Sequence, residues 1–479
     1  MIADIKPYPA MKNSGVPWLG EVPEHWEVRK LRDTLQSVTE RNRPDLPLLS
    51  VVREKGVILR DISSKEANHN FIPDDLTNYK VVRKGQFAMN KMKAWQGSYG
   101  ISRYDGIVSP AYYVFDLDGV DDKFFSTAIR SKAYVPYFTQ ASDGVRIGQW
   151  DLSQSRMREI PFSVPPAPEQ DAIVQFINYV DRRIRRYMRA KQKLIKLLEE
   201  QKQAIIHQAV TGQIDVRTGK PYPAYKSSGT CLRADTHRQI EWLSDVPEHW
   251  EPLRSWRLFS TRKELALSDD VQLSATQAYG VIPQAEFERR VGRRVTKIFM
   301  HLDKRKHVER DDFVMSMRSF QGGLERAWAS GAIRSSYVIL KPDGRANVDF
   351  FMHVFKSRGY IGALQATANF IRDGQDLTEW NFRQVDLPCP PLEEQAEIAS
   401  HVSATSARLR SEVARANREI ELLNEYLTRL IADVVTGKLD VREAAATLPD
   451  EPEESNATDN LNELLSAERQ DEPVEALEA

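Results

Sequence analysis

Two pairs of short loops combine side chains that could contact a nucleic acid. The first pair spans residues 91–99 (KMKAWQGSY) and 318–323 (RSFQGG), and the second spans residues 146–149 (RIGQ) and 372–375 (RDGQ). Cations hold phosphates, arginine and lysine read guanine, glutamine reads adenine, and glycine lets a backbone approach closely. In the alternative interpretation, these loops are tight turns whose glycines serve geometry and whose aromatic residues are core. The candidate contact residues are Lys91, Lys93, Trp95, Gln96, Ser98, Tyr99, Arg146, Gln149, Arg318, Ser319, Gln321, Arg372 and Gln375.

No catalytic centre is evident among the motifs of the chain. The sequence has no Gly-x-x-x-x-Gly-Lys phosphate loop and no Asn/Asp-Pro-Pro-Tyr/Phe run, the signature of an amino-methyltransferase. The nine histidines do not cluster, and we interpret His25 and His249 as structural because they belong to a repeated motif. We therefore expect no catalytic residue, no metal and no bound cofactor in this chain.

Composition predicts several domains and a basic body. The chain has 479 residues, too many for one ordinary core. Residues 443–479 contain twelve acidic residues and one basic residue, so with a total net charge of −1 the first 442 residues carry +10. A basic body favours a polyanionic partner, although a solubilising surface would have the same charge.

Cysteine usage and hydropathy indicate a cytoplasmic protein. The two cysteines, Cys231 and Cys389, form no CxxC pair, which argues against a disulfide framework and a zinc site. The N-terminus lacks the apolar core of a secretory signal, and no apolar run is long enough to cross a bilayer. We expect no membrane association.

The sequence contains a long internal repeat, present in two copies. A constant offset over many landmarks indicates a duplicated domain rather than a solenoid. The segments between the repeated motifs agree much less, so we expect one fold that carries two different surfaces. Three motifs recur at an offset of 224 or 225 residues: VPEHW at 22–26 and 246–250, PPxxEQ at 165–170 and 390–395, and VTGxxDVR at 210–217 and 435–442.

Each half consists of a mixed α/β part followed by a long helix. Both helices should begin after a proline-rich stop and end at Gly212 and Gly437, since glycine accepts a left-handed cap. Apolar residues alternate at steps of three and four, so the two stripes are expected to pair in an antiparallel manner. At ~1.5 Å per residue, a helix of about 38 residues spans roughly 55–60 Å. The first stripe is Ile173, Ile177, Val180, Ile184, Tyr187, Leu194, Leu198 and Ile205.

The repeat is also circular. The segment KPYPA at residues 6–10 recurs at residues 220–224 with an offset of 214, so the segment that follows the first helix also begins the chain. We expect the N-terminal segment to lie near the end of the second helix, around Val441.

These motifs, present twice and in order, resemble those of the specificity subunits of type I restriction–modification systems. The resemblance rests on WLGEVPEHW at 18–26, on the other two repeated motifs and on the alternation of variable domains with long helices, and it covers residues 5–442. It implies a non-catalytic chain whose two target-recognition domains each read one half of a split double-stranded DNA site.

The resemblance also implies partners. Two methylation subunits would bind this chain, and restriction subunits would join that core. S-adenosylmethionine would then belong to the methylation partner, and ATP and Mg to the restriction partner. Because the halves differ inside their recognition parts, the DNA site should be asymmetric.

We predict an α+β chain in which two globular α/β target-recognition domains are separated by two long helices forming an antiparallel coiled coil, with a circular pseudo-twofold repeat. Two alternatives stay open: a coiled-coil scaffold that does not read DNA, against which the basic body argues, and an enzyme with an unrecognised centre. The expected divisions are an N-terminal target-recognition domain at 1–164, a central helical spacer at 165–217, a C-terminal target-recognition domain at 218–387, a second helical spacer at 388–442 and an acidic disordered tail at 443–479.

Overall fold

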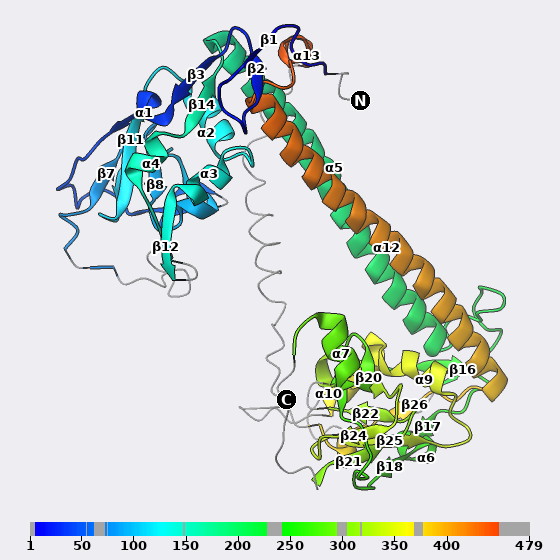
Figure 1. Cartoon of the computed structure of the whole chain (residues 1–479). Coiled ribbons are helices and arrows are strands. Elements are labelled where there is room, and N and C mark those ends of the chain that lie inside the picture. The colour runs from blue at the N-terminus through cyan, green and yellow to red at the C-terminus, as the bar shows by residue number, and fades with distance from the viewer. Residues whose placement is uncertain are drawn as a thin grey trace. The chain divides into compact units, whose positions relative to one another are not determined.

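The chain folds into two compact units, each of mixed helix and strand and each including parts of both long helices (Figure 1). Unit 1 is formed by residues from Met1–Gln192 and Asn417–Glu453, and unit 2 by residues from Lys193–Ala416. The computed structural model describes residues 5–53, 55–61, 72–73, 75–146, 149–227, 242–294, 304–316, 319–367 and 377–449.

The two long helices are α5 (Ala167–Val210) and α12 (Leu392–Val435), each of 44 residues. This confirms the prediction of two long helices, but the expected length of about 38 residues was too short. Proline is tolerated in a first turn, where its missing N–H would have no partner, so α5 includes Pro168. Gly212 and Gly437 have φ of 72° and 75°, which confirms the left-handed glycine after each helix.

Unit 1 is organised around a four-stranded antiparallel sheet in the order β4-β11-β8-β9, with two-stranded antiparallel pairs around it. Its strands are β1 (Met11–Asn13), β2 (Glu21–Pro23), β3 (Glu27–Lys30), β4 (Leu35–Ser37), β5 (Leu49–Val52), β6 (Gly56–Leu59), β7 (Lys80–Val82), β8 (Phe87–Asn90), β9 (Tyr99–Ile101), β10 (Gly106–Val108), β11 (Tyr112–Leu117), β12 (Ser142–Arg146), β13 (Gln149–Leu152) and β14 (Pro161–Val164). Its shorter helices are α1 (Leu31–Thr34), η1 (Ala94–Gln96), α2 (Asp122–Ile129), α3 (Val135–Gln140), α4 (Gln154–Arg158) and α13 (Arg442–Ala446).

Unit 2 repeats this topology, with a four-stranded sheet in the order β18-β25-β22-β23. The pairs β1-β2, β3-β14, β5-β6 and β7-β10 recur as β15-β16, β17-β26, β19-β20 and β21-β24. Its strands are β15 (Tyr225–Ser227), β16 (Asp245–Pro247), β17 (Leu253–Arg254), β18 (Phe259–Arg262), β19 (Leu273–Thr276), β20 (Gly280–Pro283), β21 (Lys306–Val308), β22 (Phe313–Met315), β23 (Glu325–Arg326), β24 (Gly331–Ile333), β25 (Val338–Pro342) and β26 (Asp386–Leu387). Its shorter helices are α6 (Ser255–Leu258), α7 (Gln284–Val291), α8 (Ser319–Gly322), α9 (Val348–Phe355), α10 (Arg358–Ala366) and α11 (Glu379–Gln384).

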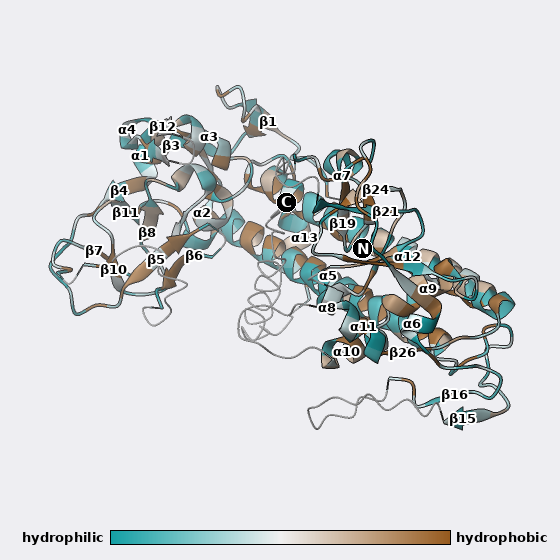
Figure 2. Ribbon diagram, turned by 90° about the horizontal axis from the view of Figure 1, so that it is seen from below, coloured by the Kyte–Doolittle hydropathy of each residue, from teal (hydrophilic) through white to brown (hydrophobic). Residues whose placement is uncertain are grey.

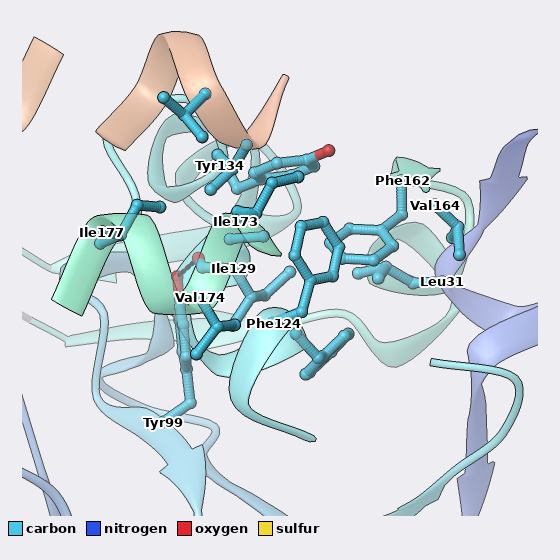
Figure 3. Packing of buried hydrophobic residues seen from close by; sticks show 14 of the residues in the cluster. Leu31, Tyr99, Phe124, Ile129, Tyr134, Phe162, Val164, Ile173, Val174 and Ile177 are labelled. Atoms are coloured by element: carbon cyan, nitrogen blue, oxygen red, sulfur yellow. Dashed lines mark hydrogen bonds between the residues drawn. The ribbon is translucent and has the colours of Figure 1, made fainter. Parts of the chain in front are cut away.

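The main core of unit 1 joins its strands and short helices to the long helices. Figure 3 shows Phe124 of α2 and Phe162 of β14 packed beside Ile173 of α5, and all three side chains are fully buried. Leu430 and Val434 of α12 belong to the same cluster, so the start of α5 lies beside the end of α12 in this unit.

In unit 2 the opposite ends of the long helices meet. Ile206 and Val210 of α5 share a buried cluster with Ile398 and Val402 of α12. Burial of these apolar side chains is the main force that holds each helix pair to its unit.

The apolar stripe of α5 leaves the buried seam near its middle. Tyr187 is 49% exposed and Leu194 is 42% exposed, although both were expected in the seam. A helix of 3.6 residues per turn drifts against a heptad pattern, and polar residues fill the gap. Lys191 pairs with Glu419 of α12 at 2.7 Å. Accordingly, Figure 2 shows polar and apolar residues mixed along both long helices.

The predicted disordered tail begins too early. Residues 442–446 form helix α13, and Ala445 is buried in the core of unit 1. Three consecutive alanines favour helix and are small enough to pack closely, so the acidic composition downstream did not decide this segment. The rest of the predicted tail, from residue 450, lies outside the described residues.

Candidate nucleic-acid interface

A buried glutamate at the start of α5 joins three segments of unit 1, and we call this arrangement the carboxylate hub. Glu169 accepts hydrogen bonds from the Tyr8 hydroxyl and, at 2.9 Å, from Trp26 Nε1. His25 Nε2 lies 2.7 Å from its second oxygen. Burial and then the adjacent carboxylate raise the pKa of Tyr8 well above its ordinary range, so the hydroxyl keeps its proton and donates.

Unit 2 contains the same hub. Glu394 accepts from the Tyr222 hydroxyl at 2.6 Å and from Trp250 Nε1 at 3.0 Å, and His249 Nε2 lies 2.8 Å from its other oxygen. The interpretation of both VPEHW histidines as structural is confirmed, because each histidine helps to hold a glutamate that is itself buried.

The glutamine that follows each hub glutamate anchors the recognition fold. Gln170 Oε1 accepts from the backbone N–H of Asp121 at 2.7 Å, and Gln395 Oε1 accepts from that of Asn347 at 2.8 Å. Asp121 and Asn347 are the N-cap residues of α2 and α9. The repeated Glu-Gln pair therefore fixes the long helix to two different parts of its unit.

The circular repeat is visible in backbone hydrogen bonds. Asp440, which follows α12, donates from its N–H to the carbonyl of Lys6 at 2.8 Å, and Asp215, which follows α5, donates to that of Lys220 at 2.9 Å. The expected approach of the N-terminal segment to the end of the second helix is confirmed.

The first predicted loop of unit 1 connects β8 to β9 and leans on the β12-β13 hairpin. Lys91 forms an ion pair with Asp151 at 2.8 Å. Trp95 stacks on Trp150, with ring centroids 5.5 Å apart. The sequence analysis missed Trp150, although it directly precedes Asp151-Leu152, a pair that recurs as Asp376-Leu377 at the offset of 225 residues and was a usable signal.

The second predicted loop of unit 1 lies in the same hairpin. The backbones of Arg146 and Gln149 are paired across β12 and β13, two residues before Asp151. Unit 1 thus brings its two predicted loops together, since the hairpin that carries Arg146 and Gln149 also supplies the partners of Lys91 and Trp95.

Three of the candidate side chains face inward. Ser98 is 2% exposed and Ser319 is 1% exposed, and Tyr99 is fully buried. Figure 3 shows Tyr99 extending into the core, where its hydroxyl donates to the carbonyl of Ile129 at 3.0 Å. Tyr99 is the first residue of β9 and Ser319 the first of α8, and neither side chain reaches the surface. These three residues are not retained as DNA contacts.

Some of the remaining candidate side chains reach the surface, and others lie outside the described residues. Lys93 and Gln321 are exposed, and Gln96 is partly exposed. Three candidates, Arg318, Arg372 and Gln375, lie outside the described residues.

A groove of about 800 Å³ in unit 2 is lined by charged residues of both signs and by aromatic and apolar residues. The Arg326 guanidinium lies 4.3 Å from the ring centroid of Trp328, which is 42% exposed. His353, also in the lining, lies 2.9 Å from Ser403 Oγ, and burial lowers its pKa to about 4.

Within the described ranges, no cluster of three His, Cys, Asp or Glu side chains could hold a metal ion. Nor does any helix of those ranges have the length and apolar content to span a membrane.

Known proteins share this architecture. No family model matches the chain. A relative from Methanocaldococcus jannaschii, named as the MjaX type I restriction enzyme specificity subunit, is 19% identical over 446 residues, which cover 88% of this chain and 96% of the relative. The EcoBI specificity subunit of Escherichia coli is 21% identical over 329 residues, 66% of each chain. This chain resembles the type I specificity subunits.

The fold agrees with that resemblance. A solved chain from a study of complex assembly and conformational transition in a type I restriction–modification system superposes with a TM-score of 0.60 at 15% identity, covering 87% of this chain and 99% of the other. Both relatives are named as specificity subunits, which confirms the predicted resemblance.

Proposed function

We propose that this chain is the subunit that reads double-stranded DNA in a type I restriction–modification complex. It recognises a bipartite, asymmetric site and directs methylation and restriction by partner subunits. The observation that carries this proposal is one fold built twice around the same carboxylate hub, with unlike side chains in its loops. In one pair of aligned loops, residues 95–98 of unit 1 are WQGS and residues 320–323 of unit 2 are FQGG.

The long helices act as the spacer in this proposal. Residues 1–164 and 218–387 are the two target-recognition domains, and residues 165–217 and 388–442 pair as an antiparallel coiled coil. A helix of 44 residues spans about 66 Å, which exceeds the ~34 Å of one turn of B-DNA. The pair can therefore hold two half-sites apart by a fixed number of base pairs.

Contact with DNA is assigned to the predicted loops without their three buried residues. Lys93 and the cations of the neighbouring hairpin hold phosphates, and glutamine amides read adenine edges. The residues retained for this role are Lys91, Lys93, Trp95, Gln96, Arg146, Gln149, Arg318, Gln321, Arg372 and Gln375.

The chemistry belongs to the partners. Two methylation subunits bring S-adenosylmethionine, and restriction subunits bring ATP and Mg. This chain binds none of these cofactors.

The test is a map of methylated bases in cells with and without the gene. The proposal expects a split motif that disappears with the gene. Replacing residues 30–160 by another recognition domain should change only one half of that motif. Loss of both halves after the replacement, or a map that does not depend on the gene, would favour a coiled-coil scaffold without DNA readout.

A further inference from the structure

A partly buried lysine whose ammonium group donates to a backbone carbonyl lies at the start of β7 in unit 1. Lys80 Nζ donates to the backbone carbonyl of Tyr112 at 2.6 Å and lies 5.7 Å from the ring centroid of Tyr113. Among the described residues, no aspartate or glutamate forms an ion pair with it. An ammonium group has three donors, so a single carbonyl leaves it only partly satisfied.

The same lysine occurs at the matching place in unit 2. Lys306 begins β21, and its Nζ donates to the carbonyl of Tyr337, also at 2.6 Å. No carboxylate of the described ranges lies within ion-pair distance of Lys306, although the charge of Glu379 acts on it.

Backbone contacts show that the two positions are equivalent. The residue after Lys80 donates to the carbonyl of Glu40, and the residue after Lys306 donates to that of Glu264, both at 2.9 Å. The offset between the lysines is 226 residues, close to that of the repeated motifs. The duplication has therefore kept a partly buried cation in both halves.

Further cations surround Lys80. Burial, and then Arg41 and Lys91, lower its pKa. Lys91 belongs to the loop at 91–99, so this cationic site continues the proposed contact surface of unit 1. Lys91 is itself paired with Asp151, whereas no carboxylate of the described residues forms an ion pair with Lys80, so an anion from outside would find this ammonium group only partly satisfied.

The charged neighbours differ in unit 2, where burial lowers the pKa of Lys306 and the charge of Glu379 opposes this shift. Arg305 is buried, with 8% exposure, and the side-chain amide of Gln272 rather than a carboxylate adjoins its guanidinium. Burial and then Arg334 lower the pKa of Arg305. The central lysine is thus common to both halves, while its charged neighbours differ.

We propose that Lys80 and Lys306 are the centres of two equivalent phosphate-binding sites, one in each unit, and that each holds a backbone phosphate of duplex DNA. This inference rests on the proposed function and adds to it a sequence-independent contact that the two halves share. Phosphate contacts fix the register of a protein on DNA, whereas base contacts select the sequence. A site kept in both halves suits the first role.

The experiment measures binding of the full-length chain to a mixed-sequence 40-bp duplex as a function of salt concentration. The variants are Lys80→Met, Lys306→Met and the double variant. Matched controls are Lys132→Met and Lys341→Met, which remove exposed lysines. Each site variant should lower the slope of log K against log salt by about 0.9 and weaken binding about threefold to tenfold, and the double variant should lower the slope by about twice as much. The controls should change the slope by much less.

Folding is monitored by near-UV circular dichroism. Where Lys80→Met does not fold, Lys80→Gln takes its place, because the amide can still donate to the Tyr112 carbonyl while the charge is removed. Wild-type slopes in the site variants, with DNA binding retained, would overturn the inference and leave the proposed function standing. Absence of salt-dependent DNA binding by the wild type would overturn both.

Discussion

Unit 1 and unit 2 form the same carboxylate hub from differently connected pieces of chain. In unit 2 the segment that supplies Tyr222 and Trp250 continues directly from α5. In unit 1 the equivalent segment, with Tyr8 and Trp26, reaches the end of α12 only through non-covalent contacts such as the hydrogen bond to Lys6. The comparison teaches that side-chain complementarity at the hub, rather than chain connectivity, specifies this fold.

The two units differ in the parts of the recognition fold that do not contact the carboxylate hub. In unit 1 a stacked pair, Trp95 and Trp150, joins the two predicted loops. Unit 2 has helix α7 directly after β20 and a groove in which Arg326 covers Trp328. A rigid frame lets the surface vary without loss of the fold, which is what a protein with two different readouts needs.

Removing the hub glutamate should give the largest effect and should break the equivalence of the units. Glu169→Ala and Glu394→Ala each leave a buried tyrosine hydroxyl and a tryptophan N–H without an acceptor, at a cost of about 3–5 kcal/mol. In Glu169→Ala the N-terminal segment should also detach, because no covalent link replaces the lost contacts. Hydrogen exchange of the Trp26 amide and of the Trp250 amide measures this difference.

The controls for the hub are exposed acidic residues one or two positions away, Asp171→Ala and Glu393→Ala. These should change the free energy of unfolding by less than about 0.5 kcal/mol. Equal protection of the Trp26 amide in Glu169→Ala and in the wild type would contradict the assigned role of the hub.

The helix-ending glycines should respond alike in the two units. A Cβ at Gly437 would meet Pro23 and lie 3.1 Å from Trp26, and one at Gly212 would meet Pro247 and lie 3.0 Å from Trp250. Both residues also have positive φ.

Gly212→Ala and Gly437→Ala should therefore each lower the free energy of unfolding by about 2 kcal/mol, measured by urea denaturation. Gly344→Ala is the control, since a Cβ there meets nothing within 4 Å. A large loss in only one of the two variants would show that the helix ends are not equivalent.

Loop substitutions should separate the units in specificity. Gln96→Ala and Gln321→Ala each remove an amide able to read adenine, which weakens recognition by about 1–3 kcal/mol, or roughly tenfold or more. Each variant should relax a different half of the site, measured as methylation of substrates with single base changes. Relaxation of the same half by both variants would refute the assignment of one half-site to each unit.

The sequence could predict the long helices and the segments that join them to each unit, because the motifs at their ends recur at a constant offset. The positions of the helices, the glycine caps and the approach of the N-terminal segment all depend on local patterns or on repeated motifs. The partners of Glu169 could not be predicted, since Tyr8 and Trp26 are brought to it by tertiary packing across more than 140 residues.

The loops were predicted less well because exposure depends on strand direction. Tyr99 has a side chain suited to DNA contact, but at the start of β9 it is buried in the core. Lys80 and Lys306 lie in no recognisable sequence motif. Only their register in the paired strands of the structure shows that the two positions are equivalent. The beginning of the predicted tail was wrong because burial of Ala445 outweighs the acidic composition that follows it.

A fall in pH should lower the free energy of unfolding of unit 2 more than that of unit 1, with a smaller effect than the substitutions above. His353 lies in α9, and the matching residue of α2 is Thr127, which does not titrate. Burial is the main cause that lowers the pKa of His353, with Asp349 opposing this shift and Arg410 adding to it. Because the folded-state pKa of about 4 lies below the ordinary 6.5, the unfolded chain takes up the proton first as the pH falls. The stability contributed by the neutral histidine is therefore complete above pH 6.5 and is lost between pH 6.5 and about 4. With allowance for its partial exposure, the loss between pH 7 and pH 5 is on the order of 1 kcal/mol.

His353→Gln keeps a polar group near Ser403 without titrating, so calorimetric unfolding of unit 2 should depend less on pH in this variant than in the wild type. The same pH dependence in both proteins would exclude His353 as the source of the difference, because carboxylates of both units titrate over the same range and are unchanged by the substitution.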